Sequence, residues 1–335
     1  MKFHKQLLLI ASKLQVTFYL FLSGILLFLL INSQLQAAST LDEPILPLPQ
    51  PSPGNPKVVE LGKLLFNNTQ LSKDKSISCA SCHHLESGGD DNLTVSEGIN
   101  NLSGNVNTPT VFNSSFNIRQ FWDGKASDLI EQIDITIQNP KEMDSNWSLV
   151  IERLKQDSIY VKLFSEAFPD GLTINNIKQS IVTFEKTLVT PNSRFDQYLR
   201  GASGSITKEE LSGYVLFKQY GCTSCHQGMA IGGNLFQKLG IMKDYFADRG
   251  DLTPADFGRF NVSKNEFDRF FFKVPSLRNV ELTAPYFHDG SVETLDDAVK
   301  KMMIYQLGIV PKQEDIQLIV QFLKTLTGEY QGKPL

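Results

Sequence analysis

Every cysteine of this 335-residue chain lies in one of two copies of the pattern Cys-x-x-Cys-His. Two thiols at this spacing can bond the two vinyl groups of one haem, and the following histidine then reaches the iron from the same side. The pattern is typical of c-type haem attachment, with histidine as the proximal iron ligand. The sequence therefore predicts two covalently bound haem c groups, attached through Cys79, Cys82 and His83 and through Cys222, Cys225 and His226.

A zinc site with four cysteine ligands and a redox dithiol are two other sites that paired cysteines build. A zinc site would have to join cysteines from opposite halves of the chain, and it would leave both motif histidines without a role. No cysteine remains for a disulfide framework. Two copies of the haem motif outweigh these alternatives.

The two motifs occupy matching places in an internal repeat. A Gly-x-x-Leu-Phe block precedes each motif, and a Pro-x-x-x-Asn block and a Phe-x-Asp-Gly block follow each one. The repeat predicts an N-terminal haem domain at 57–200 and a C-terminal haem domain at 201–335, joined near a breaker-rich stretch at 191–205. The blocks begin at Gly62, Pro109 and Phe121 in the first half and at Gly213, Pro275 and Phe287 in the second.

Apolar periodicity predicts helices in both halves. Apolar residues recur at steps of three and four from Ile174 to Leu188. Thr207 and Glu210 form a capping box, which predicts a helix that ends at Gly221. A further apolar face runs over 313–326, and no long alternating strand pattern occurs. The fold is therefore expected to be mostly helical.

The first 38 residues carry three lysines and no acid around a long apolar run, which is typical of an export segment. The run suits a cleaved signal peptide or a retained N-terminal membrane anchor, and both place the rest of the chain outside the cytoplasm. Residues 39–56 are rich in proline and read as an extended linker.

The composition excludes several classes of protein. Hydrophobic residues make up 41% of the chain and charged residues 20%, a globular mixture that fits neither a disordered chain nor a polytopic membrane protein. The formal charge is −4, and it becomes −7 when the first 38 residues are left out, so a nucleic-acid partner is not expected.

With the histidines eliminated, methionine remains as the candidate sixth ligand of the irons. Of the histidines outside the motifs, His4 lies in the export segment, His84 directly follows a ligand, and His288 replaces Trp122 of the first repeat. Met302 and Met303 lie about as far past the second motif as the methionine ligand of a cytochrome c, and methionine opposite histidine raises the haem potential. Met143 could play this part for the first haem.

Longer motifs surround both haem motifs. Those of the first half are Leu71-Ser-Lys-Asp-Lys-Ser-Ile-Ser-Cys79, Asn107-Thr-Pro-Thr, Phe121-Trp-Asp-Gly and Gln138-Asn-Pro-Lys-Glu142-Met143, and those of the second are Lys273-Val-Pro-Ser-Leu-Arg-Asn279, Thr283-Ala-Pro-Tyr-Phe-His-Asp-Gly290 and Tyr305-Gln-Leu-Gly308. With these motifs, 56–335 resembles the bacterial dihaem cytochrome c peroxidase superfamily, which includes the MauG-type enzymes. The resemblance implies an all-α fold of two cytochrome c-like domains, each carrying one covalently bound haem c.

The resemblance also implies different work for the two haems. The first would bind peroxide, and the second, held by His226 and Met302, would take electrons from a donor. Glu142 would move a proton between the peroxide oxygens, Gln132 would position peroxide or water, and Trp122 would lie between the haems. An interdomain calcium ion would take its oxygen ligands from Asn107, Thr283 and Pro285.

The sequence departs from the family pattern in the loop after the first motif. Many members carry a histidine there that caps the peroxide-binding iron until the other haem is reduced, but the corresponding position lies near Ile99, and residues 85–106 contain no usual haem ligand. The first haem is therefore expected to be five-coordinate or water-bound when oxidised. MauG-type enzymes also lack the cap, but they have a tyrosine at the position of Met302.

Three functions follow from these observations. The first is reduction of hydrogen peroxide to water with electrons from a small c-type cytochrome or a copper protein, in the periplasm or otherwise outside the cytoplasm. The second is a MauG-like oxidase of a protein or small molecule. The third is a non-catalytic dihaem electron carrier in which Met143 binds the first iron. A homodimer is compatible with each of them.

Overall fold

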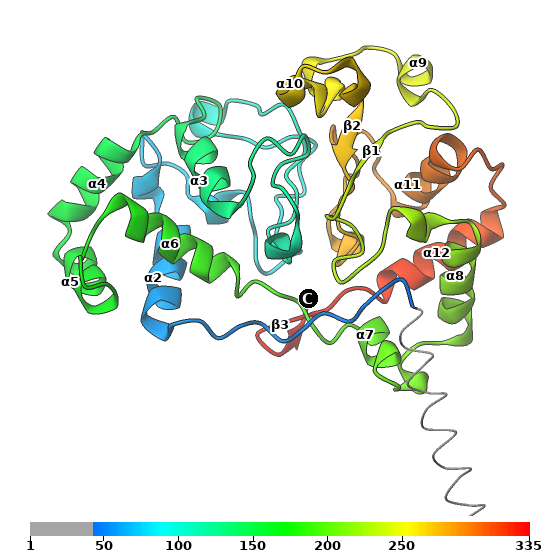
Figure 1. Cartoon of the computed structure of the whole chain (residues 1–335), viewed down its shortest axis with the longest axis horizontal. Coiled ribbons are helices and arrows are strands. Elements are labelled where there is room, and N and C mark those ends of the chain that lie inside the picture. Colours follow the sequence, from blue (N-terminus) through cyan, green and yellow to red (C-terminus); the bar gives the residue numbers. More distant parts are fainter. Residues whose placement is uncertain (1–42) are drawn as a thin grey trace, which may run out of the picture. The chain divides into compact units, whose positions relative to one another are not determined.

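The computed structural model describes residues 43–335, so the expected export segment at 1–38 lies outside the described residues. Residues Ile45–Leu335 form one compact unit that is mostly helical and contains little sheet (Figure 1). This confirms the expected helical class. The helices are α2 (Pro56–Phe66), α3 (Leu129–Gln138), α4 (Trp147–Gln156), α5 (Ser158–Ala167), α6 (Ile174–Glu185), α7 (Arg194–Leu199), α8 (Lys208–Gln219), α9 (Tyr245–Arg249), α10 (Phe260–Ser263), α11 (Leu295–Lys301) and α12 (Gln313–Lys324).

The strands are short and form two antiparallel pairs. β1 (Phe236–Lys238) pairs with β2 (Phe271–Lys273), and β3 (Glu329–Tyr330) pairs with β4 (Lys333–Pro334). A π-helical turn at Met302–Gln306 directly follows α11. Such turns occur often at functional sites, and this one begins at the methionine expected to bind the second iron.

The helices predicted from periodicity are confirmed. The helix expected from Ile174 begins there, with the Thr173 side chain accepting from the N–H of Asn176, and it ends at Glu185. The capping box of Thr207 and Glu210 is present and starts α8, whose last residue lies two positions before Gly221. Gly221 has a φ of 83°, a left-handed value that favours glycine.

Each half of the unit is built on one close helix pair. Gly62 of α2 lies against Ser180 and Phe184 of α6, where an added Cβ would overlap the carbonyl oxygen of Ser180. Gly213 of α8 lies against Leu318 and Phe322 of α12 in the same way. The first pair lies at the left of Figure 1 and the second at the right. The glycine of each repeat therefore lets two helix backbones approach closely.

The two halves meet at Thr190, which binds the asparagine of both Pro-x-x-x-Asn blocks. Asn113 and Asn279 both have a left-handed backbone, and their side-chain amides donate to the Thr190 hydroxyl at 2.9 and 3.1 Å. The Asn113 side chain accepts from the N–H of Thr190, as that of Asn279 does from the N–H of Gly328. All three side chains are buried, so this junction satisfies polar groups inside the unit.

Residues 45–56, which fall in the expected linker, pack on the rest of the unit. Their chain runs from the second half to α2 in the first (Figure 1). Ile45 and Leu48 are completely buried, and Ile45 forms a bridge with Gly228 in the loop after the second haem motif. The proline-rich composition therefore accompanies an extended segment with two anchored apolar side chains.

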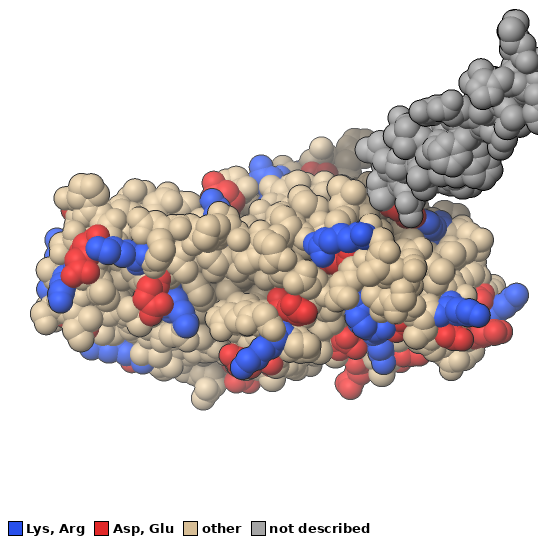
Figure 2. Space-filling view, turned by 90° about the horizontal axis from the view of Figure 1, so that it is seen from below, with Lys and Arg blue, Asp and Glu red and all other residues tan. Residues whose placement is uncertain are grey.

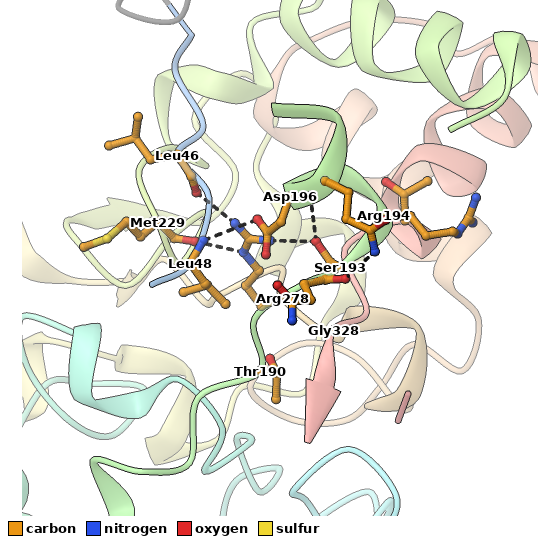
Figure 3. Close-up of polar contacts among 12 residues, drawn as sticks. Leu46, Leu48, Thr190, Ser193, Arg194, Asp196, Met229, Arg278 and Gly328 are labelled. Carbon is orange, nitrogen blue, oxygen red and sulfur yellow. Dashed lines mark hydrogen bonds and ion pairs between the residues drawn. The ribbon is translucent and has the colours of Figure 1, made fainter. Parts of the chain in front are cut away.

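A buried arginine holds this segment in place. Arg278 forms an ion pair with Asp196 at 2.8 Å, and both side chains are completely buried. The same guanidinium donates to the carbonyl oxygens of Leu46 and Met229 (Figure 3). Arg278 thus ties together residues 45–48, α7 and the loop that follows His226.

None of the helices within residues 43–335 is long and apolar enough to cross a membrane. Figure 2 shows acidic and basic side chains interspersed over one face of the molecule, and this face has no extended basic area.

Candidate functional site

Two interior cavities each contain one Cys-x-x-Cys-His motif. The first cavity is lined by the motif at Cys79 and by residues of α3, α6 and the 94–106 loop. The second is lined by the motif at Cys222 and by residues of α11, α12 and the π-helical turn. Blocks after each motif, at 109–111 and 275–277, line the corresponding cavity, so the sequence repeat is also a repeat of the site.

A single helical turn presents each motif. The turn Cys79–Ser81 begins after Ser78, whose N–H donates to the Ser81 hydroxyl at 2.9 Å, and the turn Cys222–Ser224 begins after Gly221. The N–H of each motif histidine donates to the carbonyl of the first motif cysteine, at 3.0 Å for His83 and 2.9 Å for His226. This turn brings two thiols and one imidazole to the same cavity wall.

The surroundings of the motifs fit haem better than zinc. All four cysteines within the described residues are free thiols, and burial raises the pKa of Cys82 and of Cys222 to about 12. A zinc site needs thiolates, which burial disfavours, whereas thioether attachment takes neutral sulfur into an apolar cavity. The residues present therefore fit two haem c groups.

Both motif histidines are oriented for iron binding. The Nδ1 atom of His83 lies 3.0 Å from the Gly89 carbonyl oxygen, and that of His226 lies 3.2 Å from the Ile231 carbonyl oxygen. A proton on Nδ1 leaves Nε2 free as a ligand. Burial lowers the pKa of both rings, that of His226 to about 4, which favours the neutral form that a metal requires.

The first cavity brings Gln132 and Glu142 together through a residue that the sequence analysis missed. The amide of Gln132 donates to the Thr136 hydroxyl at 3.1 Å, and this hydroxyl also hydrogen-bonds the Glu142 carboxyl. Asn139 donates to Glu142 at 2.6 Å. Burial raises the pKa of Glu142, while these hydrogen bonds oppose the rise. Thr136 lies one helical turn after Gln132, and only that spacing could have indicated it.

Trp122 lines the second cavity rather than the first. Its indole N–H donates to the Asn107 carbonyl oxygen at 2.9 Å, and Asn107 lines both cavities. The Trp122 ring packs edge-on to the His288 ring, with centroids 6.5 Å apart. Trp122 and Asn107 therefore link the two cavities.

His288 is held by a polar cluster that the sequence did not indicate. Its Nε2 lies 2.7 Å from Asp256, which also pairs with Arg249 at 2.6 Å. Although burial opposes it, hydrogen bonds from His288 and Arg249 hold the pKa of Asp256 well below its usual range. Asp256, His288 and Asp289 are close enough to hold a metal ion, but Arg249 already pairs with both carboxylates. His288 is thus engaged in hydrogen bonding to Asp256 and ring packing on Trp122.

The remaining expected ligands lie around the second cavity. Met302 and Met303 both line it, and Met303 belongs to the buried core of the second half. Asn107, Thr283 and Pro285 also lie along this wall. The amide N–H of Asn107 donates to the Leu93 carbonyl at 2.8 Å, which leaves its amide oxygen to serve as the expected calcium ligand.

The loop that would carry a capping histidine packs against Glu142. The N–H of Ile99 donates to the Glu142 carbonyl oxygen at 2.9 Å, and the Ile99 side chain is buried. Hydrogen bonds from Ser96 to Val106 and from Gly104 to Ser96 close the base of the loop. A buried apolar residue thus anchors this loop on the Glu142 backbone.

Sequence and structure comparisons place this arrangement among known proteins. A family model described as "Di-haem cytochrome c peroxidase" matches residues 56–204. "Cytochrome c551 peroxidase" of Nitrosomonas europaea is 47% identical over 289 residues, which are 86% of this chain and 85% of that protein. "Cytochrome c peroxidase Ccp" of Escherichia coli is 47% identical over 290 residues, and the chain spans 62% of its length. A solved MauG-like protein associated with microbial copper homeostasis superposes with a TM-score of 0.73 at 27% identity, covering 84% of this chain and 94% of that one.

A mostly helical unit with a Cys-x-x-Cys-His motif in each of two cavities is the arrangement of a dihaem c-type protein. With relatives 47% identical over most of its length, the chain belongs to the di-haem cytochrome c peroxidase family, and it is an oxidoreductase of the cytochrome c peroxidase type. Two haem c groups are the cofactors that this family implies.

Proposed function

We propose that the chain is an exported enzyme that reduces hydrogen peroxide to two molecules of water, consuming two protons and two electrons from a small c-type cytochrome or copper protein. The observation that carries this proposal is the difference between the two cavities. The first contains the Glu142 carboxyl and the Gln132 amide beside its motif, whereas no Asp or Glu of the described residues lines the second. One cavity suits proton transfer and the other suits electron transfer.

In this function, haem supplies the iron that binds peroxide in the first cavity and stores electrons in the second. Cys79, Cys82 and His83 would hold the first haem, and Cys222, Cys225, His226 and Met302 would hold the second. Glu142 accepts a proton from one peroxide oxygen and delivers it to the other, while Gln132 orients the peroxide. Thr136 and Asn139 hold Glu142 in place through the hydrogen bonds described above.

Trp122 is the aromatic residue that assists electron passage between the cavities. Its hydrogen bond to Asn107 and its contact with His288 support a fixed ring orientation. A calcium ion bound by the amide oxygen of Asn107 and the carbonyl oxygens of Thr283 and Pro285 would hold the same wall, since these are hard oxygen ligands.

A haem held by His83 in the first cavity would have no capping histidine from the 94–106 loop, so its iron would be open to peroxide in the oxidised enzyme. Support comes from this loop, which contains no usual haem ligand and is hydrogen-bonded to the Glu142 backbone through the N–H of Ile99. Peroxide could then bind without prior reduction of the second haem. The missing cap is also the feature that favours the second candidate, a MauG-like oxidase of a protein or small molecule.

The two haem groups belong to two cytochrome c-like domains at 57–200 and 201–335. The matching helix pairs α2–α6 and α8–α12 support this division. An export segment at 1–38, cleaved or retained as an anchor, directs the chain to the periplasm or another compartment outside the cytoplasm.

The test is a steady-state peroxide assay with reduced cytochrome c, begun once from fully oxidised and once from half-reduced enzyme. We expect turnover without a lag from both starting states. A lag from the oxidised state alone would contradict the open iron, and absence of turnover from either state would contradict the peroxidase function. Oxidation of a candidate protein substrate with equivalents of peroxide would then favour the MauG-like reaction.

A further inference from the structure

The repeat makes Glu185 of the first half equivalent to Leu323 of the second. Gly62 packs on Phe184 as Gly213 packs on Phe322, so the next residues, Glu185 and Leu323, occupy corresponding places. The backbone confirms the register, because the Leu188 carbonyl accepts from Asn113 as the Leu326 carbonyl accepts from Asn279. A carboxyl group thus replaces an apolar side chain at one position of the first cavity.

Both residues face their haem cavity. Glu185 lines the first cavity together with Ile181, and Leu323 lines the second together with Ile319. Glu185 is only 6% exposed, and its Oε2 atom has no hydrogen-bond partner among the described residues. A buried and unpaired carboxyl is costly for stability, so its presence needs an explanation beyond packing.

No opposite charge compensates Glu185 from the elements packed around it. The group that interacts with it electrostatically is Cys79, and the His83 ring bonds Gly89 instead. Burial alone raises the pKa of Glu185 to about 8. The other titratable groups on these elements are exposed, half-buried or paired with another residue: Lys57, Glu60 and Lys63 of α2, Glu131 and Asp134 of α3, Lys178 and Lys186 on and after α6, Tyr330 of β3, and Glu97 and Glu142 in the cavity.

We propose that Glu185 binds one proton from solvent when the haem of the first cavity accepts one electron from the reduced donor, and releases that proton when the electron leaves. The iron passes from ferric to ferrous while the carboxylate becomes a carboxylic acid, so the charge of the cavity does not change. An electron added beside an uncompensated carboxylate would otherwise be opposed by repulsion in a low-dielectric interior. The inference rests on the proposed haem of the first cavity but not on peroxide turnover.

This coupling makes the potential of the first haem depend on pH. A proton taken up with one electron lowers the potential by up to about 59 mV for each tenfold fall in proton concentration. The second haem has Leu323 in the equivalent place and a titratable neighbour of its own, Lys273, whose pKa burial lowers to about 8. Variants must therefore be compared haem by haem.

The experiment is a spectroelectrochemical titration of both haems from about pH 6 to about pH 9, a range that brackets the raised pKa of Glu185, in the haem-loaded full-length protein as wild type and as Glu185→Gln. We expect the potential of the first haem to fall with pH in the alkaline part of this range, where Glu185 of the oxidised wild type is ionised, and to lose most of this slope in Glu185→Gln, which preserves size and hydrogen bonding. The profile of the second haem should be the same in both proteins. Glu142→Gln tests the other buried carboxyl of the same cavity, and Glu166→Gln, an exposed carboxyl of α5, is the control that should keep the slope.

A first-haem slope that is absent in the wild type, or unchanged in Glu185→Gln, would overturn the proposal. A slope lost only in Glu142→Gln would also overturn it, because the proton would then belong to the catalytic carboxyl. Peroxide turnover measured on the same wild-type sample distinguishes the peroxidase function from proton uptake by Glu185. A protein that is inactive but shows a Glu185-dependent slope would contradict the peroxidase function and support the proton uptake.

Discussion

Arg278 and Asp196 form a completely buried ion pair, 2.8 Å apart, that joins the loop after the second haem motif to α7 and to residues 45–48. In the first repeat the position of Arg278 is taken by Phe112, which packs on the loop after His83 at Gly89. The ion pair thus holds this loop in the second half, as the Phe112 ring holds the corresponding loop in the first. It also contacts residues 45–48, which have no counterpart in the first half's contact.

Removing one partner of this pair should destabilise the fold strongly. Arg278→Met leaves Asp196 buried without a counter-charge, and such a loss costs about 3–5 kcal/mol. The measurement is the denaturant midpoint of haem-loaded protein. Lys162→Ala, which removes an exposed pair with Glu166 at 3.9 Å, is the control and should change stability by less than about 1 kcal/mol. Equal losses of stability in Arg278→Met and Lys162→Ala would contradict this role of the buried ion pair.

Glu142→Gln should lower peroxide turnover by about 10²-fold or more, the usual contribution of a positioned acid–base group. Because Glu142 must be ionised to accept a proton and burial raises its pKa, wild-type turnover should fall on the acid side at a pH above the ordinary 4.5. This acid limb should vanish in the variant. Glu166→Gln, at the exposed end of α5, is the control, and near-normal turnover in Glu142→Gln would remove this residue from the mechanism.

The oxidised enzyme should contain high-spin ferric haem in the first cavity, visible by EPR, because the 94–106 loop offers Ile99 rather than a ligand. Met143→Leu should leave this spin state unchanged. If Met143 bound the iron, the wild type would instead show only low-spin haem, and the substitution would convert the first haem to high spin. That result would favour the electron-carrier function.

Met302→Leu should remove the sixth ligand of the second haem. We expect a lower potential and a high-spin component for that haem, since methionine raises the potential of the iron it binds. Met303→Leu is the matched control, because Met303 belongs to the buried core and a leucine of similar volume should pack there. If Met303→Leu, and not Met302→Leu, lowered the potential and produced the high-spin component, Met303 would be the sixth ligand and Met302 would not.

Local features of the sequence predicted much of the fold. The helix from Ile174 and the capping box of Thr207 follow from periodicity and from residues three positions apart, which no distant contact overrides. The structure adds that each haem motif shares a cavity wall with the Pro-x-x-x-Asn block of its own repeat. The burial of Ile45 and Leu48 was not foreseen, because a proline-rich segment contains no sign of what it packs against.

The sequence does not predict polar contacts between residues that lie far apart along the chain. Asp256 and His288 are 32 positions apart, and the Leu48 N–H that donates to Asp196 lies 148 positions from it, so only the folded chain brings these polar groups together. Thr136 was missed because a threonine on a helix is usually solvent-facing. Glu185 stands out only beside Leu323, the residue at the equivalent position of the second helix pair.

The contacts of Thr190 show that the two repeated halves of the chain do not depend on each other equally. Its hydroxyl serves Asn113 of its own half and Asn279 of the other, whereas the corresponding position of the second half is Gly328, which has no hydroxyl to offer. An isolated second half would leave the buried Asn279 amide short of a partner, at a cost of about 1–3 kcal/mol. The copies are therefore no longer interchangeable modules, because the second half depends on a hydroxyl group that only the first half supplies.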